Sequence, residues 1–158
     1  MTRETYEHLE RLAVAWARAQ EDLILARGIP LDPRAASDAS RLGVQNIDGI
    51  KVLVVNRIPM PDNPELMEAA RRMQIITASS RAVTMGHGIM IRADAWGDRE
   101  LMVHQLIHVM QCERCGGFER YLQLYLSDRA EATFSAGTFE EEARAGAREF
   151  CSSEAVKA

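Results

Sequence analysis

Residues 101–117 read LMVHQLIHVMQCERCGG, and this stretch decides how the rest of the sequence is interpreted. Asp98 before it is a residue type that caps helix N-termini, and the glycine pair at its end is typical of a helix stop. Between these signals the residues through Met110 are apolar on nearly every side, apart from the polar residues of the HQLIH segment. The pattern therefore predicts a helix that is buried on most sides.

His104 and His108 are the residues of this helix that need an explanation. They are four positions apart, so one helix face presents both imidazoles to a single tetrahedral ion. An isolated His-x-x-x-His pair is weak evidence, because hydrogen-bonded core histidines are common. Burial strengthens the metal interpretation, since coordination satisfies one ring nitrogen and a neighbouring acceptor satisfies the other. We predict zinc ligands; two separate core histidines are the alternative.

A third ligand is expected from an acidic helix near the end of the chain. Residues 138–141 read TFEE, a capping box that opens a helix running to about Cys151. The apolar stripe of this helix consists of Phe139, Ala143, Ala147 and Phe150. At ~100° per residue, Glu140 lies nearest the stripe, Glu142 farther round and Glu141 opposite. We predict Glu140 as the third ligand, and Glu142 remains a second candidate for that position. The alternative is that these glutamates form a solvated acidic first turn that interacts favourably with the helix dipole.

The N-terminal residues 1–28 are predicted to form a helix that packs on the core. Apolar residues recur every three or four positions along residues 9–26, and Gly28 ends the pattern. A shorter helix is expected to begin at Pro33, and another over residues 64–73, where a proline follows an asparagine cap. The first helix carries no reactive residue, so we interpret it as a packing element, and we interpret residues 59–73 as a connector and not a domain boundary.

Two segments are predicted to form a small sheet. Residues 50–58 are dense in β-branched side chains and stop at a proline. Residues 82–92 contain a Gly-His-Gly triplet followed by IMI, which indicates a strand with a bend or a close backbone approach. With a further helix around residues 121–126, the predicted class is α+β: several helices packed on a small sheet, with a buried metal-binding helix.

Composition limits the protein classes. A chain of 158 residues, 47% hydrophobic and 27% charged, is predicted to form one globular domain over residues 1–158, with its metal-site core in residues 82–151. A net charge of -4 and a pI near 5.6 argue against nucleic-acid binding. The charged N-terminus and the absence of an apolar run of ~18 residues indicate no signal peptide, no membrane span and a cytoplasmic location.

The helix resembles the HELxHVxQ-type helix of small bacterial zincin-like metallopeptidases, and the later segment FEEEAR resembles their ExEA segment. The resemblance covers about residues 86–147. It implies a minimal zincin fold with a gluzincin-like zinc site, in which His104 and His108 are the helix ligands and Glu140 is the distal ligand. Gln105 then stands at the position of the catalytic general base.

Gln105 is the main departure from this family. In active members the glutamate at this position accepts a proton from the attacking water, which an amide cannot do. Loss of a general base costs ~10²- to 10⁴-fold in rate. We therefore expect a zinc-binding protein with weak or absent hydrolysis. The alternatives are a metal-free scaffold or binding protein that retains the fold, and a working peptidase in which Glu was replaced to inactivate it.

Other polar residues are candidates for lining the cleft or for contacting the predicted metal ligands. His87 in the Gly-His-Gly turn, Tyr121 and Tyr125 are predicted either to line the cleft or to have no role there. Arg144 stands where related helices carry Asp. A peptide or protein is the expected ligand class, and no nucleic acid or membrane is expected as a partner.

Cys112 and Cys115 form a Cys-x-x-Cys in the last turns of the same helix. Buried free thiols are the favoured interpretation, and a second metal or a redox switch is the alternative. Cys112 is also a candidate for lining the cleft or for contacting the metal ligands. A straight helix separates His104 from Cys112 by ~12 Å, so these cysteines cannot share the histidines' ion. With Cys151 the cysteines number three, which argues against a disulfide framework.

Overall fold

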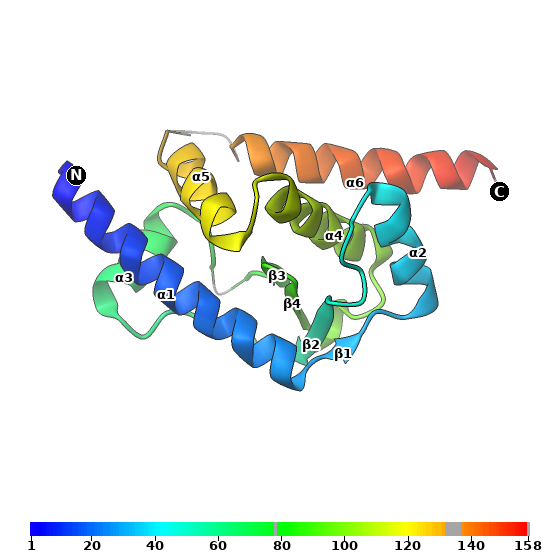
Figure 1. The fold of residues 1–158 in the computed structure, drawn as a ribbon, viewed down its shortest axis with the longest axis horizontal. Helices are drawn as coiled ribbons and strands as arrows, with labels where there is room; N and C mark the ends of the chain where they lie inside the picture. The colour runs from blue at the N-terminus through cyan, green and yellow to red at the C-terminus, as the bar shows by residue number, and fades with distance from the viewer. Residues whose placement is uncertain (78, 132–136, 158) are drawn as a thin grey trace.

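The computed structural model describes residues 1–77, 79–131 and 137–157, with the backbone alone for residues 154–157. These residues form six α-helices and a four-stranded mixed sheet, which confirms the predicted α+β class (Figure 1). Among them, no helix combines the length and the apolar character that a membrane crossing requires.

The sheet consists of β1 (Ile29–Pro30), β2 (Lys51–Val55), β3 (Ala82–Met85) and β4 (Gly88–Arg92), in the order β1-β2-β4-β3. The central pair β2 and β4 is parallel, with Val52 opposite Ile89, whereas β1 and β3 pair antiparallel at the two edges. β2 is shorter than the predicted strand over residues 50–58. β1 was not predicted, because two residues carry no periodic pattern.

Residues 82–92 form a hairpin and not the single strand that was predicted. Gly86 has a φ of 66°, a left-handed conformation that favours glycine, and it reverses the chain between β3 and β4. The expected close backbone approach is confirmed at Gly88, where an added Cβ would lie 2.9 Å from the side chain of Ile24. The glycines of this segment therefore serve both the turn and the packing of the first helix on β4.

The helices are α1 (Arg3–Arg27), α2 (Pro33–Leu42), α3 (Pro64–Arg72), α4 (Arg99–Arg114), α5 (Phe118–Glu131) and α6 (Thr138–Lys157). Several begin at the caps that the sequence indicates: Asp98 accepts a hydrogen bond from the backbone of Leu101 at 3.0 Å, and Asn63 caps α3 in the same way. The capping box predicted for α6 is replaced, because Gly137 precedes the helix and Asp128 accepts a hydrogen bond from Phe139 N.

Side chains alternate between the two faces of the sheet and build two core clusters. On one face Ile89 and Ile91 pack with Leu106 and Val109 of α4, and α2 covers the same cluster. On the other face Met90 packs under α1 and α5. The sheet thus lies between α4 on one face and α1 on the other, and α6 runs along α4 (Figure 1).

Candidate metal centre

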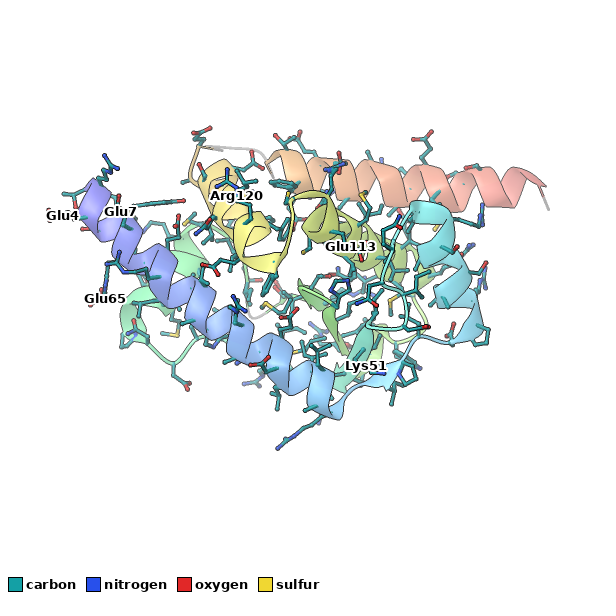
Figure 2. All side chains as sticks on the ribbon, viewed as in Figure 1. Glu4, Glu7, Lys51, Glu65, Glu113 and Arg120 are labelled. Atoms are coloured by element: carbon teal, nitrogen blue, oxygen red, sulfur yellow. The ribbon has the colours of Figure 1, made fainter. Side chains whose placement is uncertain are left out.

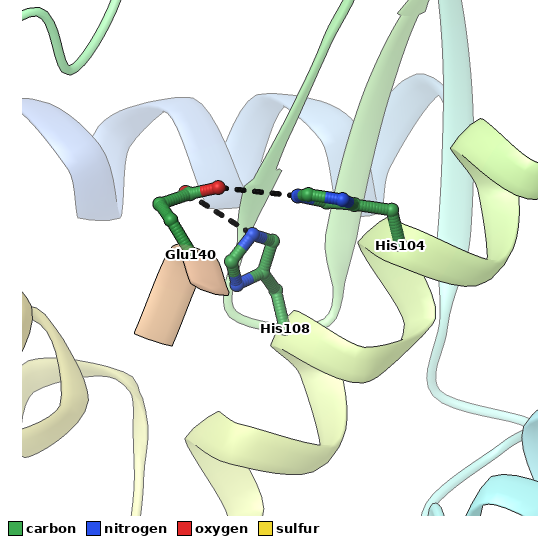
Figure 3. A group of neighbouring side chains, drawn as sticks. All are labelled: His104, His108 and Glu140. Atoms are coloured by element: carbon green, nitrogen blue, oxygen red, sulfur yellow. Dashed lines mark hydrogen bonds and ion pairs between the residues drawn. The ribbon is translucent and has the colours of Figure 1, made fainter. Parts of the chain in front are cut away.

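Three side chains from two helices converge beside the sheet. His104 and His108 lie one turn apart on α4, and Glu140 reaches them from the first turn of α6 (Figure 3). His104 Nε2 is 3.2 Å from Glu140 Oε2, and His108 Nε2 is 3.2 Å from Glu140 Oε1. Their ligand atoms all lie within 4.8 Å of one another. The predicted group is therefore assembled, with the donor set and spacing to hold a metal ion.

The packing of α6 on α4 places Glu140. Ala143 and Ala147 are almost fully buried against Val103 and Ile107 of α4. Their small side chains let the two helix backbones approach closely, so the first turn of α6 lies over the histidines. Gly146 adds to this fit, because a Cβ there would lie 3.0 Å from Ile107 Cδ1.

The donor set fits zinc. Two imidazole nitrogens and one carboxylate are the protein ligands of many catalytic zinc sites, and the fourth tetrahedral position is left for a ligand. Tetrahedral neighbours at a metal–ligand distance of ~2.05 Å stand ~3.3 Å apart. The two nitrogen–oxygen distances of 3.2 Å, each to a different oxygen of the Glu140 carboxylate, are close to that edge. Other transition ions accept the same ligands, so the geometry alone does not select the metal.

The outer nitrogen of His108 is fixed by Gln111, which is fully buried. Gln111 Nε2 donates to Phe139 O at 3.1 Å and to Glu142 Oε1 at 2.8 Å, and these two acceptors fix the orientation of the amide. Gln111 Oε1 therefore faces His108 Nδ1 at 2.8 Å, and the ring must donate from Nδ1. Tyr121 Oη lies 3.1 Å from the same nitrogen.

This hydrogen bond determines what His108 presents to Glu140. A neutral imidazole that donates from Nδ1 carries a lone pair on Nε2. That lone pair faces a carboxylate oxygen of Glu140 at 3.2 Å, so two acceptors oppose each other. A cation between them removes the conflict, either as a metal ion or as a proton on the ring.

Glu140 is held as an anion at neutral pH. Burial alone raises the pKa of its carboxyl group, but the contacts with His104 and His108 and the hydrogen bond from Tyr125 together lower that pKa well below its usual range. Tyr125 Oη donates to Glu140 Oε1 at 2.8 Å. The pKa of Tyr125 is raised, first by burial and then by the charge of Glu140, so the phenol stays a neutral donor.

Gln105 lies beside the two histidines and is hydrogen-bonded to the edge strand β3. Its side chain is 4% exposed, and the hydroxyl of Thr84 on β3 lies 2.8 Å from its Oε1 and 3.2 Å from its backbone oxygen. The position that the resemblance assigns to a general base therefore holds an amide. Strand spacing alone did not reveal Thr84 as its partner.

Glu142 lies outside the metal group. Its Oε1 accepts hydrogen bonds from Gln111 and from Arg114 Nη2, the latter at 2.7 Å. Burial raises the pKa of Glu142, but the bonds from Arg114 and Gln111 outweigh it and the pKa is lowered. Of the two candidate ligands, the structure brings Glu140 to the histidines, whereas Glu142 is linked to His108 through Gln111.

His87 lies in the β3–β4 turn, away from the metal group. Its Nε2 is 2.9 Å from Glu113 Oε2, and Glu113 also accepts hydrogen bonds from the backbone nitrogens of Gln45 and Asn46. Glu113, labelled in Figure 2, belongs to the last turn of α4. Glu113 was not singled out from the sequence, because a single glutamate in a helix gives no signal of its distant partners.

Cys112, Cys115 and Cys151 are thiols that form no disulfide with one another. Cys112 is 2% exposed and packs with Tyr121 and Tyr125 behind His108. Burial is the main cause that raises the pKa of its thiol, so Cys112 is a protonated, apolar core residue. Within the described ranges, His104, His108 and Glu140 are the one group of potential metal ligands, and the cysteines join none.

A cavity of about 1110 Å³ opens next to the metal group. His104, Gln105, His108 and Glu140 line it, and β3 contributes Thr84 to the same lining. Side chains of α1, α3 and α5 form its remaining walls. A ligand of considerable size can therefore reach the three candidate metal ligands.

Comparisons of the chain with protein-family models, with curated proteins and with solved structures gave no match. The function must therefore be argued from the site itself.

Proposed function

We propose that this chain is a zincin-like zinc-binding protein in which His104, His108 and Glu140 hold the ion. The observation that carries this proposal is the arrangement of His108, whose Nδ1 is committed to Gln111 while its Nε2 faces an anionic carboxylate. A zinc ion between these atoms satisfies both, and it also accepts His104. The resemblance to small bacterial zincin-like metallopeptidases supports the same ligand set.

Hydrolysis is proposed to be weak or absent. Bound zinc supplies Lewis-acid chemistry, which polarises a carbonyl oxygen. The residues around it bind and orient: Tyr125 and Gln111 hold the ligands, and Thr84 holds Gln105. The amide of Gln105 cannot take up a proton, so the group that an active enzyme needs at this position is missing.

A peptide or protein segment is the ligand class that we propose for the cavity. β3 is an edge strand, so the side of its backbone that faces away from β4 has no strand partner among the described residues. The same strand lines the cavity next to Gln105. An extended chain paired with β3 would pass the metal group.

Metal content tests the proposal directly. Elemental mass spectrometry of purified, tag-free protein is expected to find about one zinc per chain after zinc reconstitution and dialysis. His104→Ala and Glu140→Ala remove ligands and are expected to lose the ion. His8→Ala is the matched control, because His8 lies half-exposed beside Glu65, away from the group. Absence of zinc in the reconstituted wild-type protein contradicts the proposal.

A metal-free scaffold is the second candidate function. The observation in its favour is that Glu140 can also accept hydrogen bonds from protonated rings of His104 and His108, and from Tyr125. The group would then be a buried polar network that stabilises the packing of α6 on α4. In that case a chelator leaves the thermal unfolding midpoint unchanged, whereas removal of bound zinc lowers it.

A further inference from the structure

Gln105 directs a hydrogen-bond donor into the cavity. The shorter contact of the Thr84 hydroxyl, 2.8 Å, is to Gln105 Oε1, so the amide oxygen is the atom held on the strand. Gln105 Nε2 has no hydrogen-bond partner among the described residues. It is also not among the polar atoms of those residues that are fully buried without a hydrogen bond. Gln105 lines the cavity, and with its amide oxygen on Thr84, Nε2 is the side-chain atom left to donate to a ligand there.

The charge balance of the zinc-loaded centre favours an anion. Zinc carries two positive charges and Glu140 one negative charge, so one positive charge remains. A glutamate at position 105 would cancel that charge, but Gln105 is neutral. The other charged side chains that line the cavity are Glu10 and Glu141 against Arg72, Arg129 and Arg144, so together they add no net negative charge. The centre therefore attracts a single negative charge.

The cavity wall away from the centre combines charged side chains, Glu10, Arg72 and Arg129, with an apolar part. Met85 of β3, Ile76, and Leu122 and Leu126 of α5 line it and belong to the core cluster under α1. They offer a ligand hydrocarbon surface and not hydrogen-bond partners. A ligand that reaches from the metal group along the apolar part of this wall needs an anionic head and an apolar body.

We propose that the site binds a terminal carboxylate borne on an apolar chain, with one carboxylate oxygen toward the ion and the other accepting from Gln105 Nε2. This inference rests on the proposed zinc site and names its ligand. Two sources share this chemistry: a fatty acid, and the C-terminal residues of an apolar peptide. The neutral Gln105 is then a specificity residue of a binding protein, not merely the loss of a base.

Calorimetric titration of zinc-loaded protein at pH 8 tests the inference. The probes are decanoate and an N-acetylated tripeptide that ends in leucine, each paired with its neutral carboxamide. The expected result is that at least one carboxylate binds roughly 10- to 100-fold more tightly than its carboxamide, since a charge-assisted hydrogen bond and the ionic attraction are lost. The probe that binds identifies the source as lipid or peptide.

Substitution of Gln105 localises the effect. Gln105→Glu adds a negative charge and is expected to weaken carboxylate binding roughly 10- to 100-fold with unchanged zinc content, and Gln105→Leu removes the donor alone and should cost less. Gln20→Glu, a partly exposed change on α1 outside the cavity, is the matched control. Equal affinity for carboxylate and carboxamide, no binding, or an unaffected Gln105→Glu variant overturns the inference. If zinc itself fails to load, the proposed function falls as well.

Discussion

Gln105 is one atom away from the glutamate of an active zincin, and this difference gives the first prediction. Gln105→Glu places a carboxylate at the same point of α4, beside Thr84 and the metal group. A general base is worth ~10²- to 10⁴-fold in rate, so the zinc-loaded variant is expected to cleave peptides at least ~10²-fold faster than the wild-type chain. Fluorogenic peptide libraries provide the measurement.

The control for this gain is the double variant Gln105→Glu with Glu140→Ala. It keeps the base and loses a metal ligand, so its cleavage rate should return to the wild-type level. A Gln105→Glu protein that carries zinc and still shows no cleavage contradicts the idea that a missing base is what limits hydrolysis.

Gln111 carries the second residue-scale prediction. Gln111→Leu keeps the approximate volume but removes the acceptor that fixes His108 Nδ1. Loss of a hydrogen bond to a ligand histidine typically costs 10- to 100-fold in metal affinity, and we expect zinc affinity to fall by roughly that factor. Competition with a chromophoric chelator measures it. Gln123→Leu, on α5 and outside the metal cavity, is the control that should keep wild-type affinity.

At the scale of elements, Glu113 joins the end of α4 to two segments that are distant in sequence. It accepts hydrogen bonds from Gln45 N at 2.7 Å and Asn46 N at 2.9 Å and pairs with His87 of the β3–β4 turn. Burial raises the pKa of Glu113, but these bonds lower it more, and the net pKa lies below the usual value. The carboxylate form therefore stabilises the fold.

The third prediction follows from the sign of that shift. Because the pKa of Glu113 is lower in the folded state than the ~4.3 of an unfolded chain, its contribution is complete above that pH and is lost as pH falls through the folded-state pKa. Glu113→Gln is expected to reduce the free energy of unfolding by roughly 1 to 3 kcal/mol at pH 7, and by progressively less below about pH 4. Urea unfolding across this pH range measures the difference.

Glu119→Gln is the matched control for Glu113→Gln. Glu119 forms a half-exposed ion pair with Arg18, and pairs of that kind contribute about 0 to 1 kcal/mol. Its variant should differ little from the wild type at every pH. A Glu113→Gln difference that stays constant down to pH 3 would show that the group does not titrate as described.

Local signals predicted the elements where they were strong and missed them where tertiary contacts decide. Asp98 and Asn63 cap helices, and the apolar pattern of α4 indicated its burial. The β3–β4 hairpin was predicted as one strand, because a Gly-His-Gly triplet fits both a bend and a reversal. The start of α6 depends on Asp128 of α5, a contact that the capping-box pattern cannot contain.

For the metal group, helical periodicity selected Glu140 over Glu142, and the structure brings Glu140 to the histidines. Periodicity succeeds here because both ligand-bearing segments are regular helices. It could not reveal that Thr84 holds Gln105, or that Gln111 reaches across to Glu142. Those contacts depend on how α4 packs against β3 and α6, which a single sequence does not encode in its local pattern.

At the scale of the whole molecule, the fourth prediction is that zinc stabilises the entire fold. The ion would join α4 to α6, which otherwise pack mainly through small apolar residues such as Ala143 and Ala147. A free zinc concentration 100-fold above the dissociation constant adds about 2.7 kcal/mol to the free energy of unfolding. Circular dichroism is expected to show a midpoint that rises with zinc and falls after chelation.

The variants separate specific from general effects of zinc on stability. His104→Ala should abolish the zinc-dependent rise, because it removes a ligand from α4, whereas His8→Ala on α1 should retain it. A rise that persists in His104→Ala would place the stabilising zinc elsewhere on the chain.

The separation of the ligands along the chain also has a consequence for biosynthesis. Glu140 follows His104 by 36 positions, and α5 lies between them. A ribosome therefore completes both imidazoles well before it adds the carboxylate. A nascent chain that meets zinc at that stage can hold it only through two nitrogens, and firm capture must wait until α6 has been made and docked. Metal acquisition by this protein is thus expected to be a late event, after translation has passed the final helix.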